Sequence, residues 1–247
     1  MSALILRIIA CVAMLLDHIG YINGNQVLRA IGRIAFPIFV YLICNGFRYT
    51  SCRWRYALRL AVFALISQIP FSLLCSNTLT YQTGNVFFTL LAALLCIWTT
   101  DMLRANKIGK WFIWLPTAAF CVLYLLDWLK SDYGAKGIVL AMVFYLFDGK
   151  KWWQRICLIL GCCVAVFYNQ LVSVALTLLQ KRMFAFPELS RWDLWQLFSL
   201  AALPLIFLYN GKKGPQASNK ILAKLTQIGF YLFYPLHMLV LWLLNIL

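Results

Sequence analysis

Residues 4–22 read "LILRIIACVAMLLDHIGYI", and the rest of the chain is interpreted from this stretch. At ~1.5 Å per residue, a helix of this length crosses the ~30 Å hydrocarbon layer of a membrane. The stretch nevertheless contains Arg7, Asp17 and His18, in a chain that has only seven acidic residues and two histidines. Ionisable side chains inside a span are rare, so this helix is expected to carry part of a functional site.

The composition is that of a membrane protein. Hydrophobic residues make up 64% of the 247 residues and charged residues 12%, whereas a soluble domain is about half apolar and a quarter charged. The net charge of +15 does not indicate nucleic-acid binding, because lysine and arginine fall in short stretches between apolar runs. The nine cysteines lie mostly inside those runs without a C-x-x-C pair, which favours free thiols, and no metal site is expected.

The hydropathy pattern predicts an all-α bundle of about nine transmembrane helices, with a range of eight to ten. The seventh run is interrupted at 168–170, so it is expected to be broken or re-entrant. No linker or internal repeat is visible, and residues 1–247 are expected to form a single transmembrane domain. The predicted spans are 3–22, 27–47, 56–75, 85–103, 111–128, 133–147, 156–179, 192–209 and 226–246.

The distribution of positive charge predicts the orientation. Segments 48–59, 104–110, 150–155 and 211–224 are rich in lysine and arginine, whereas 76–84 has no charge. Because cytoplasmic loops carry the excess of positive residues, the N-terminus and these four basic segments are expected on the cytoplasmic side of a bacterial inner membrane.

The first helix places two ionisable groups on one face. Arg7 and His18 are eleven residues apart, which is about three full turns, or ~16 Å along the axis. Arg7 is expected near the cytoplasmic face and His18 in the outer half of the membrane. Asp17 lies about 100° round the helix, so it faces a neighbouring helix or flanks the same cavity.

The second span, "LRAIGRIAFPIFVYLICNGFR" at 28–48, carries an arginine near each end. Arg33 is expected at the depth of His18, where it could form an ion pair with Asp17 that is either structural or part of the site. Arg48 ends the span on the cytoplasmic side. Pro37 is expected to break the helix locally.

The last span contains the second histidine. His237 lies thirteen residues beyond Lys224, or ~20 Å from the cytoplasmic edge, which is near the level of His18. An imidazole at this depth can take a proton from an attacking amine or hydroxyl. Asp17 could orient the imidazole of His18. Arg7, Arg33 and Arg48 could bind the phosphates of a donor that enters from the cytoplasm. Such a layout is expected of a membrane acyl-CoA transferase.

Four stretches resemble the TraX family of conjugation-associated membrane proteins: "LRIIACVAMLLDHIGYI", "RAIGRIAFPIFVYLICNGFRYT", "RYALRLAVFALISQIPF" and "YLFYPLH". The family is similar to a wider transmembrane acyltransferase superfamily, whose first helix has an arginine, ten residues and a histidine, as at Arg7 and His18. The resemblance implies N-terminal acetylation of a pilin-like peptide with acetyl-CoA as donor. It implies that His18 and His237 are site residues, and Asp17 is expected to complete the catalytic group by orienting His18.

Several alternatives stay open at this stage. The acceptor could instead be a hydroxyl of a cell-surface glycan, which would make the protein an O-acyltransferase. Intramembrane aspartate and histidine also serve as proton relays, so a proton-coupled transporter or flippase is a second functional class. A membrane-bound assembly factor without catalytic activity is a third. For the acyltransferase, direct transfer and a covalent acyl-histidine both fit the sequence.

Overall fold

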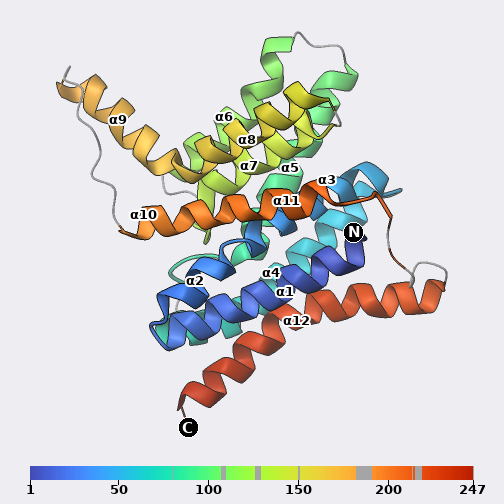
Figure 1. Cartoon of the computed structure of the whole chain (residues 1–247), viewed down its shortest axis with the longest axis vertical. Coiled ribbons are helices and arrows are strands. Elements are labelled where there is room, and N and C mark those ends of the chain that lie inside the picture. The colour runs from blue at the N-terminus through green and yellow to red at the C-terminus, as the bar shows by residue number, and fades with distance from the viewer. Residues whose placement is uncertain are drawn as a thin grey trace.

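The computed structural model describes residues 1–79, 81–106, 110–125, 129–149, 151–181, 191–212, 214 and 219–246. Helices account for nearly all of the described elements (Figure 1). They are α1 (Ala3–Ile22), α2 (Gln26–Gly32), α3 (Ala35–Tyr49), α4 (Arg53–Ser76), α5 (Val86–Ala105), η1 (Lys110–Trp114), α6 (Leu115–Leu125), α7 (Gly134–Phe147), α8 (Trp152–Val166), α9 (Tyr168–Lys181), α10 (Arg191–Gln196), η2 (Leu197–Ala201), α11 (Ala202–Phe207) and α12 (Lys220–Ile246).

The predicted all-α, multi-pass membrane fold is confirmed. Five apolar helical segments are long enough to span a membrane: α1, the combined segment Gln26–Tyr49, α4, α5 and Ile221–Asn245. The pair α8 and α9 adds a sixth if it counts as one span, and it bends by 67° at the position where the sequence predicted a break. Three further apolar helices, Phe112–Leu125, Gly134–Phe147 and Leu194–Phe207, are shorter. Length and composition therefore support five or six of the nine predicted crossings.

The break between α2 and α3 has a local cause. α2 ends at Gly32 and α3 begins at Ala35, so the break lies at residues 33–34 and α3 begins two residues before Pro37, where the sequence predicted the break. Proline lacks an N–H and cannot bond the carbonyl four residues before it, which here is that of Arg33. Pro37 therefore lies in the first turn of α3, where a missing donor costs nothing, and the interruption falls just before that helix.

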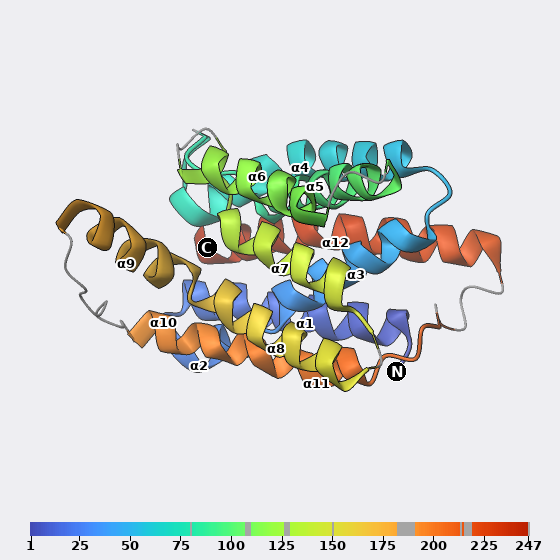
Figure 2. The same ribbon diagram turned by 90° about the horizontal axis from the view of Figure 1, so that it is seen from above.

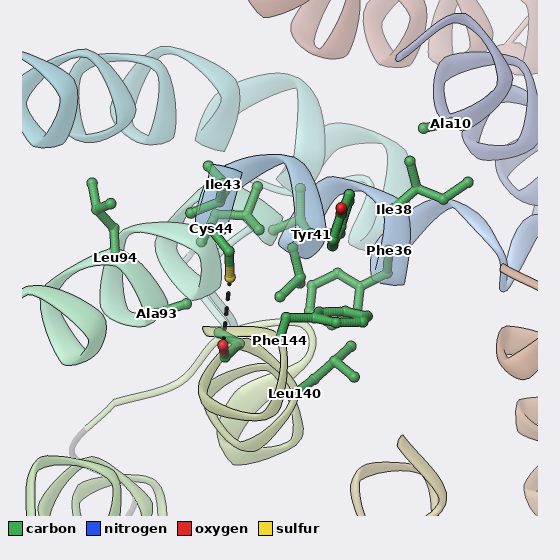
Figure 3. Packing of buried hydrophobic residues seen from close by; sticks show 14 of the residues in the cluster. Ala10, Phe36, Ile38, Tyr41, Ile43, Cys44, Ala93, Leu94, Leu140 and Phe144 are labelled. Carbon is green, nitrogen blue, oxygen red and sulfur yellow. Dashed lines mark hydrogen bonds between the residues drawn. The ribbon is translucent and has the colours of Figure 1, made fainter. Parts of the chain in front are cut away.

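The helices form a layered bundle. Seen from above, α4, α5 and α6 lie on one side, α1, α2, α8 and α11 on the other, and α3, α7 and α12 between them, while α9 projects from the bundle (Figure 2). The centre is tightly packed: Cys44 of α3 donates to the carbonyl of Ala141 in α7 at 3.4 Å, beside the fully buried Phe144 (Figure 3). A Cβ on Gly137 would lie 2.4 Å from Thr89 of α5, so the absence of a side chain lets α5 and α7 approach.

The outward faces are apolar, as lipid contact requires. Ile8 and Val12 of α1 are exposed, as are Leu65 and Ile69 of α4 and Leu244 of α12. Large exposed apolar areas are uncommon on soluble monomers and normal for helices in hydrocarbon.

The described parts of the predicted basic segments share one end of the bundle, while residues 107–109, 150, 213 and 215–218 lie outside the described residues. There Arg48 pairs with Asp148, Arg53 pairs with Asp101 at 2.8 Å, and the N-terminal amine donates to a carbonyl at the end of α11 at 2.7 Å. At the opposite end, Trp242 of α12 donates to Asn77 at 3.0 Å. The grouping is the one expected from the charge pattern, and its cytoplasmic orientation stays a prediction.

Candidate active site

The two histidines of the chain lie against each other. His18 Nδ1 of α1 and His237 Nε2 of α12 are 2.8 Å apart, and their ring centroids are 5.0 Å apart. The segments that carry them come from opposite ends of the sequence, as the colours of α1 and α12 in Figure 1 make visible. The equal depth of the two residues, estimated from sequence by counting turns, therefore corresponds to a direct hydrogen bond.

A backbone carbonyl sets the direction of this hydrogen bond. His237 Nδ1 lies 2.7 Å from the carbonyl oxygen of Phe233, which can only accept, so the proton of a neutral His237 is on Nδ1. Its Nε2 then accepts from the Nδ1–H of His18. The remaining nitrogen, His18 Nε2, carries a lone pair, and no described residue hydrogen-bonds it. The arrangement leaves one imidazole nitrogen as a base.

Aromatic side chains hold His237 in place. The Phe233 ring stacks on it with centroids 4.9 Å apart, and Tyr234 meets it edge-on at 5.8 Å. His237 is 7% exposed. Pro235 interrupts the hydrogen bonding of α12 at this level, and the helix bends along its length in Figure 1.

The Asp17 carboxylate, predicted to orient an imidazole, contacts arginines instead. It binds Arg33 at 2.5 Å and Arg29 at 3.2 Å, both from the segment that follows α1. A Cβ on Gly32 would lie 2.3 Å from Cβ of Asp17, so glycine is required where α1 and α2 cross. The ion pair proposed from sequence between Asp17 and Arg33 exists, while the orienting contact to His18 comes from His237 instead, because the carboxylate faces α2.

A cavity of about 360 Å³ lies between α1, α3, α4, α5 and α12. Arg7 and Arg59 line it together with aromatic side chains that include Tyr56, Phe230 and Tyr231. The Arg7 guanidinium carbon is 5.8 Å from the centre of the Phe230 ring. The lining also includes Met14 and Tyr234, each one helical turn before a histidine of the pair. The cavity thus extends from two arginines to the level just below the imidazoles.

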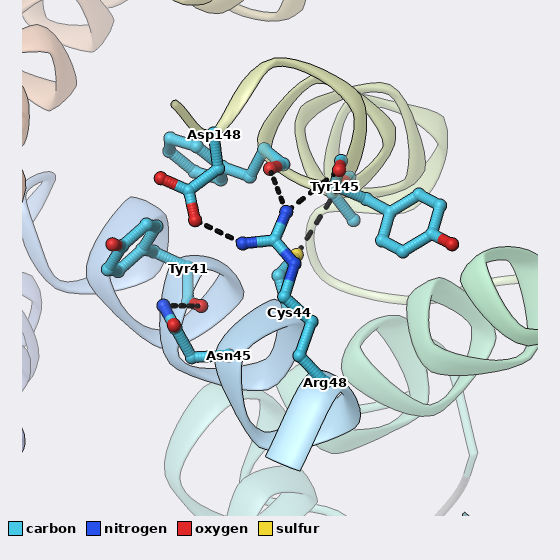
Figure 4. A network of polar contacts seen from close by, with 8 residues as sticks. Tyr41, Cys44, Asn45, Arg48, Tyr145 and Asp148 are labelled. Atoms are coloured by element: carbon cyan, nitrogen blue, oxygen red, sulfur yellow. Dashed lines mark hydrogen bonds and ion pairs between the residues drawn. The ribbon is translucent and has the colours of Figure 1, made fainter. Parts of the chain in front are cut away.

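Two of the predicted donor-binding arginines lie elsewhere. Arg33 is engaged with Asp17 and does not line this cavity. Arg48 forms an ion pair with Asp148 and donates to the carbonyls of Tyr145 at 2.8 Å and Phe144 at 3.3 Å (Figure 4). It thereby satisfies the C-terminal carbonyls of α7, where the helix dipole is negative. Counting residues along a helix gives the depth of a side chain and not the direction in which it points, so the sequence could not show that Arg33 and Arg48 face away from the cavity.

Sequence reasoning missed Arg59 and Tyr56 as cavity residues. Arg59 was counted among the basic residues of 48–59 that set topology, yet it lies in the second turn of α4. Tyr56 is buried three residues before it. The spacing of three residues puts both side chains on adjacent positions of one helix face, and this signal could have been used.

Sequence comparisons show which known proteins this chain is similar to. A sequence profile described as TraX protein matches residues 2–245. A protein of Dichelobacter nodosus, named probable fimbrial assembly protein FimC, serogroup H1, is 28% identical over 96% of this chain and 92% of its own length. An uncharacterized protein of Rickettsia prowazekii (strain Madrid E) is 26% identical over 71% of this chain and 66% of its own length. No solved structure matches.

Proposed function

The chain belongs to the TraX family, and from that premise we propose that it is an acetyl-CoA-dependent membrane acetyltransferase that acts in pilus assembly. The acceptor we propose is the N-terminal amine of a pilin-like peptide, and the membrane is the bacterial inner membrane. The name of the Dichelobacter nodosus relative, which refers to fimbrial assembly, supports the pilus connection.

The observation that carries the proposal is the hydrogen-bonded histidine pair. His18 Nε2 has a lone pair because the carbonyl of Phe233 fixes His237, and His237 fixes His18. A positioned imidazole of this kind contributes about 10²–10⁴-fold as a general base. His237 has the role that a carboxylate has in catalytic triads, because it selects the tautomer and the ring orientation of the base.

The transfer balances with these groups alone. The amine nitrogen of the acceptor attacks the thioester carbonyl carbon of acetyl-CoA, a C–N bond forms, and the C–S bond breaks. His18 Nε2 takes the proton that the amine loses and returns it to the departing CoA thiolate. The products are an N-acetylated acceptor and free CoA.

The cavity supports binding of the donor. Arg7 and Arg59 are cations at the end of the cavity away from the histidines, and guanidinium groups match the geometry of phosphate oxygens. Arg7 is ~16 Å from His18 along α1, so an extended pantetheine arm lying along the cavity would bring a thioester toward the imidazoles while the phosphates stay at the arginines. Arg33 and Arg48 are not part of this proposal, since both are engaged in ion pairs outside the cavity.

The test is transfer of radiolabel from [¹⁴C]acetyl-CoA to a pilin-like peptide by the purified protein. The wild type is compared with His18→Ala, and both must elute as folded protein in detergent. We expect label in the peptide only with the wild type. Equal transfer by both proteins would rule out His18 as the base, and a peptide with a blocked N-terminus should take no label.

A further inference from the structure

The cavity closes one turn before the histidine pair. Of its lining residues, Met14 on α1 precedes His18 by four positions, and Tyr234 on α12 precedes His237 by three. Neither histidine lines the cavity. The side chains of Met14 and Tyr234, together with Phe87 beside Tyr234, therefore line the inner end of the space in which a donor would lie.

The two side chains differ in how firmly they are held. Tyr234 is 3% exposed and packs edge-on against Phe87 of α5, with ring centroids 5.0 Å apart. Met14 is buried at 8% exposure, and its unbranched thioether is the more adaptable of the two. Of the pair, Met14 is the one whose truncation enlarges the inner end of the cavity without removing a packed ring.

We propose that Met14 determines the acyl-chain length of the donor, restricting it to acetyl-sized groups. The inference rests on the proposed transferase function and concerns the same cavity. A thioester that lies in the cavity with its carbonyl toward His18 places its methyl group at the inner end, against Met14. Additional methylene groups would meet a side chain in a packed interior, where added atoms are costly because the surroundings yield little.

The same geometry predicts how the limit can be moved. Met14→Ala removes the Cγ, Sδ and Cε atoms and leaves a hole at the inner end of the cavity. Butyryl-CoA, which is longer than acetyl-CoA by two methylene groups, would fill that hole. One methylene in a hydrophobic pocket changes discrimination by roughly 10–200-fold, so the butyryl-to-acetyl ratio should rise at least about tenfold.

The experiment compares transfer of acetyl and butyryl groups by the full-length protein. The variants are Met14→Ala, Met14→Leu, which conserves volume, and Met142→Ala. Met142 is a matched control, because it is fully buried in α7 and does not line the cavity. Binding of the two acyl-CoA molecules is measured in parallel by titration calorimetry, which requires no turnover. If Met14→Ala yields no folded protein, Met14→Val replaces it.

We expect Met14→Ala to raise the butyryl-to-acetyl ratio in both transfer and binding, while Met14→Leu and Met142→Ala keep the wild-type ratio. An unchanged ratio in Met14→Ala overturns the inference, as does an equal rise in Met142→Ala, which would indicate general loosening of the bundle. Failure of the proposed function has a different signature: the wild type then transfers neither group, whatever the binding ratios are.

Discussion

Neutralising Asp17 should destabilise the protein far more than breaking an ion pair at the end of the bundle. The Asp17 carboxylate binds Arg33 and Arg29, and the side chains of Asp17 and Arg33 are 13% and 8% exposed. Asp17→Asn keeps the shape and an acceptor oxygen but removes the negative charge. Two guanidinium groups in a mostly buried setting then lose the carboxylate that both contact.

The magnitude follows from burial. Removing one partner of a buried ion pair costs about 3–5 kcal/mol, because the other charge has already given up its hydration. For a chain of this size each kcal/mol shifts the melting temperature by about 2–4 °C, so the expected decrease is about 6–20 °C. The pair of Arg53 and Asp101 is 39% and 30% exposed, and an exposed pair is worth about 0–1 kcal/mol.

The assay is thermal unfolding in detergent, followed by fluorescence-detected size exclusion after heating. Asp17→Asn is compared with Arg53→Gln, which should lower the melting temperature by less than about 4 °C. A decrease no larger than that of Arg53→Gln would refute the reasoning. Activity per folded molecule should change little in Asp17→Asn, since the carboxylate faces the arginines; a loss of 10²-fold or more would restore Asp17 as the orienting residue.

Three further predictions concern the cavity and the histidine pair. Arg59→Gln should raise KM for acetyl-CoA at least severalfold with little change in kcat, whereas Arg55→Gln, outside the cavity lining, should leave KM as in the wild type; steady-state kinetics decide between them. His237→Phe removes the acceptor of the imidazole pair and should lower kcat by about 10²–10⁴-fold and alter the pH–rate profile, and unaltered kinetics would exclude an orienting role of His237. In Gly46→Ala the new Cβ would lie 2.7 Å from the Tyr56 hydroxyl and press that ring toward the cavity, so calorimetry should show weaker donor binding that Tyr56→Phe partly restores.

The sequence contained enough to predict the helices and the meeting of the histidines. A long apolar run predicts a helix in contact with lipid, and the observed apolar helices overlap the predicted runs. Counting turns from the charged ends gave His18 and His237 equal depths, and a shared depth in a small bundle makes contact feasible. The ion pair of Asp17 and Arg33 could be predicted in the same way, because their helices are consecutive and joined by a short turn.

Rotation about each helix axis was harder to predict. Arg48 and Arg59 both lie near the basic end of the bundle, yet one satisfies the carbonyls at the end of α7 and the other lines the cavity. Which face turns inward depends on how α3, α4 and α7 pack, and periodicity is a weak guide when nearly every position is apolar. The number of crossings was uncertain for a related reason, since short and bent helices lose the length signal.

The separation of the two histidines in the chain sets the order in which the protein can mature. Asp17 and Arg33 are 16 residues apart, so this ion pair can form soon after the first hairpin leaves the ribosome. His18 and His237 are 219 residues apart, and at ~5–20 residues per second the first imidazole waits roughly 10–45 s for its partner. A ribosome that stalls before α12 therefore leaves a chain in which the ion pair of Asp17 and Arg33 can form and the imidazole pair cannot, because His237 is supplied only by the last helix.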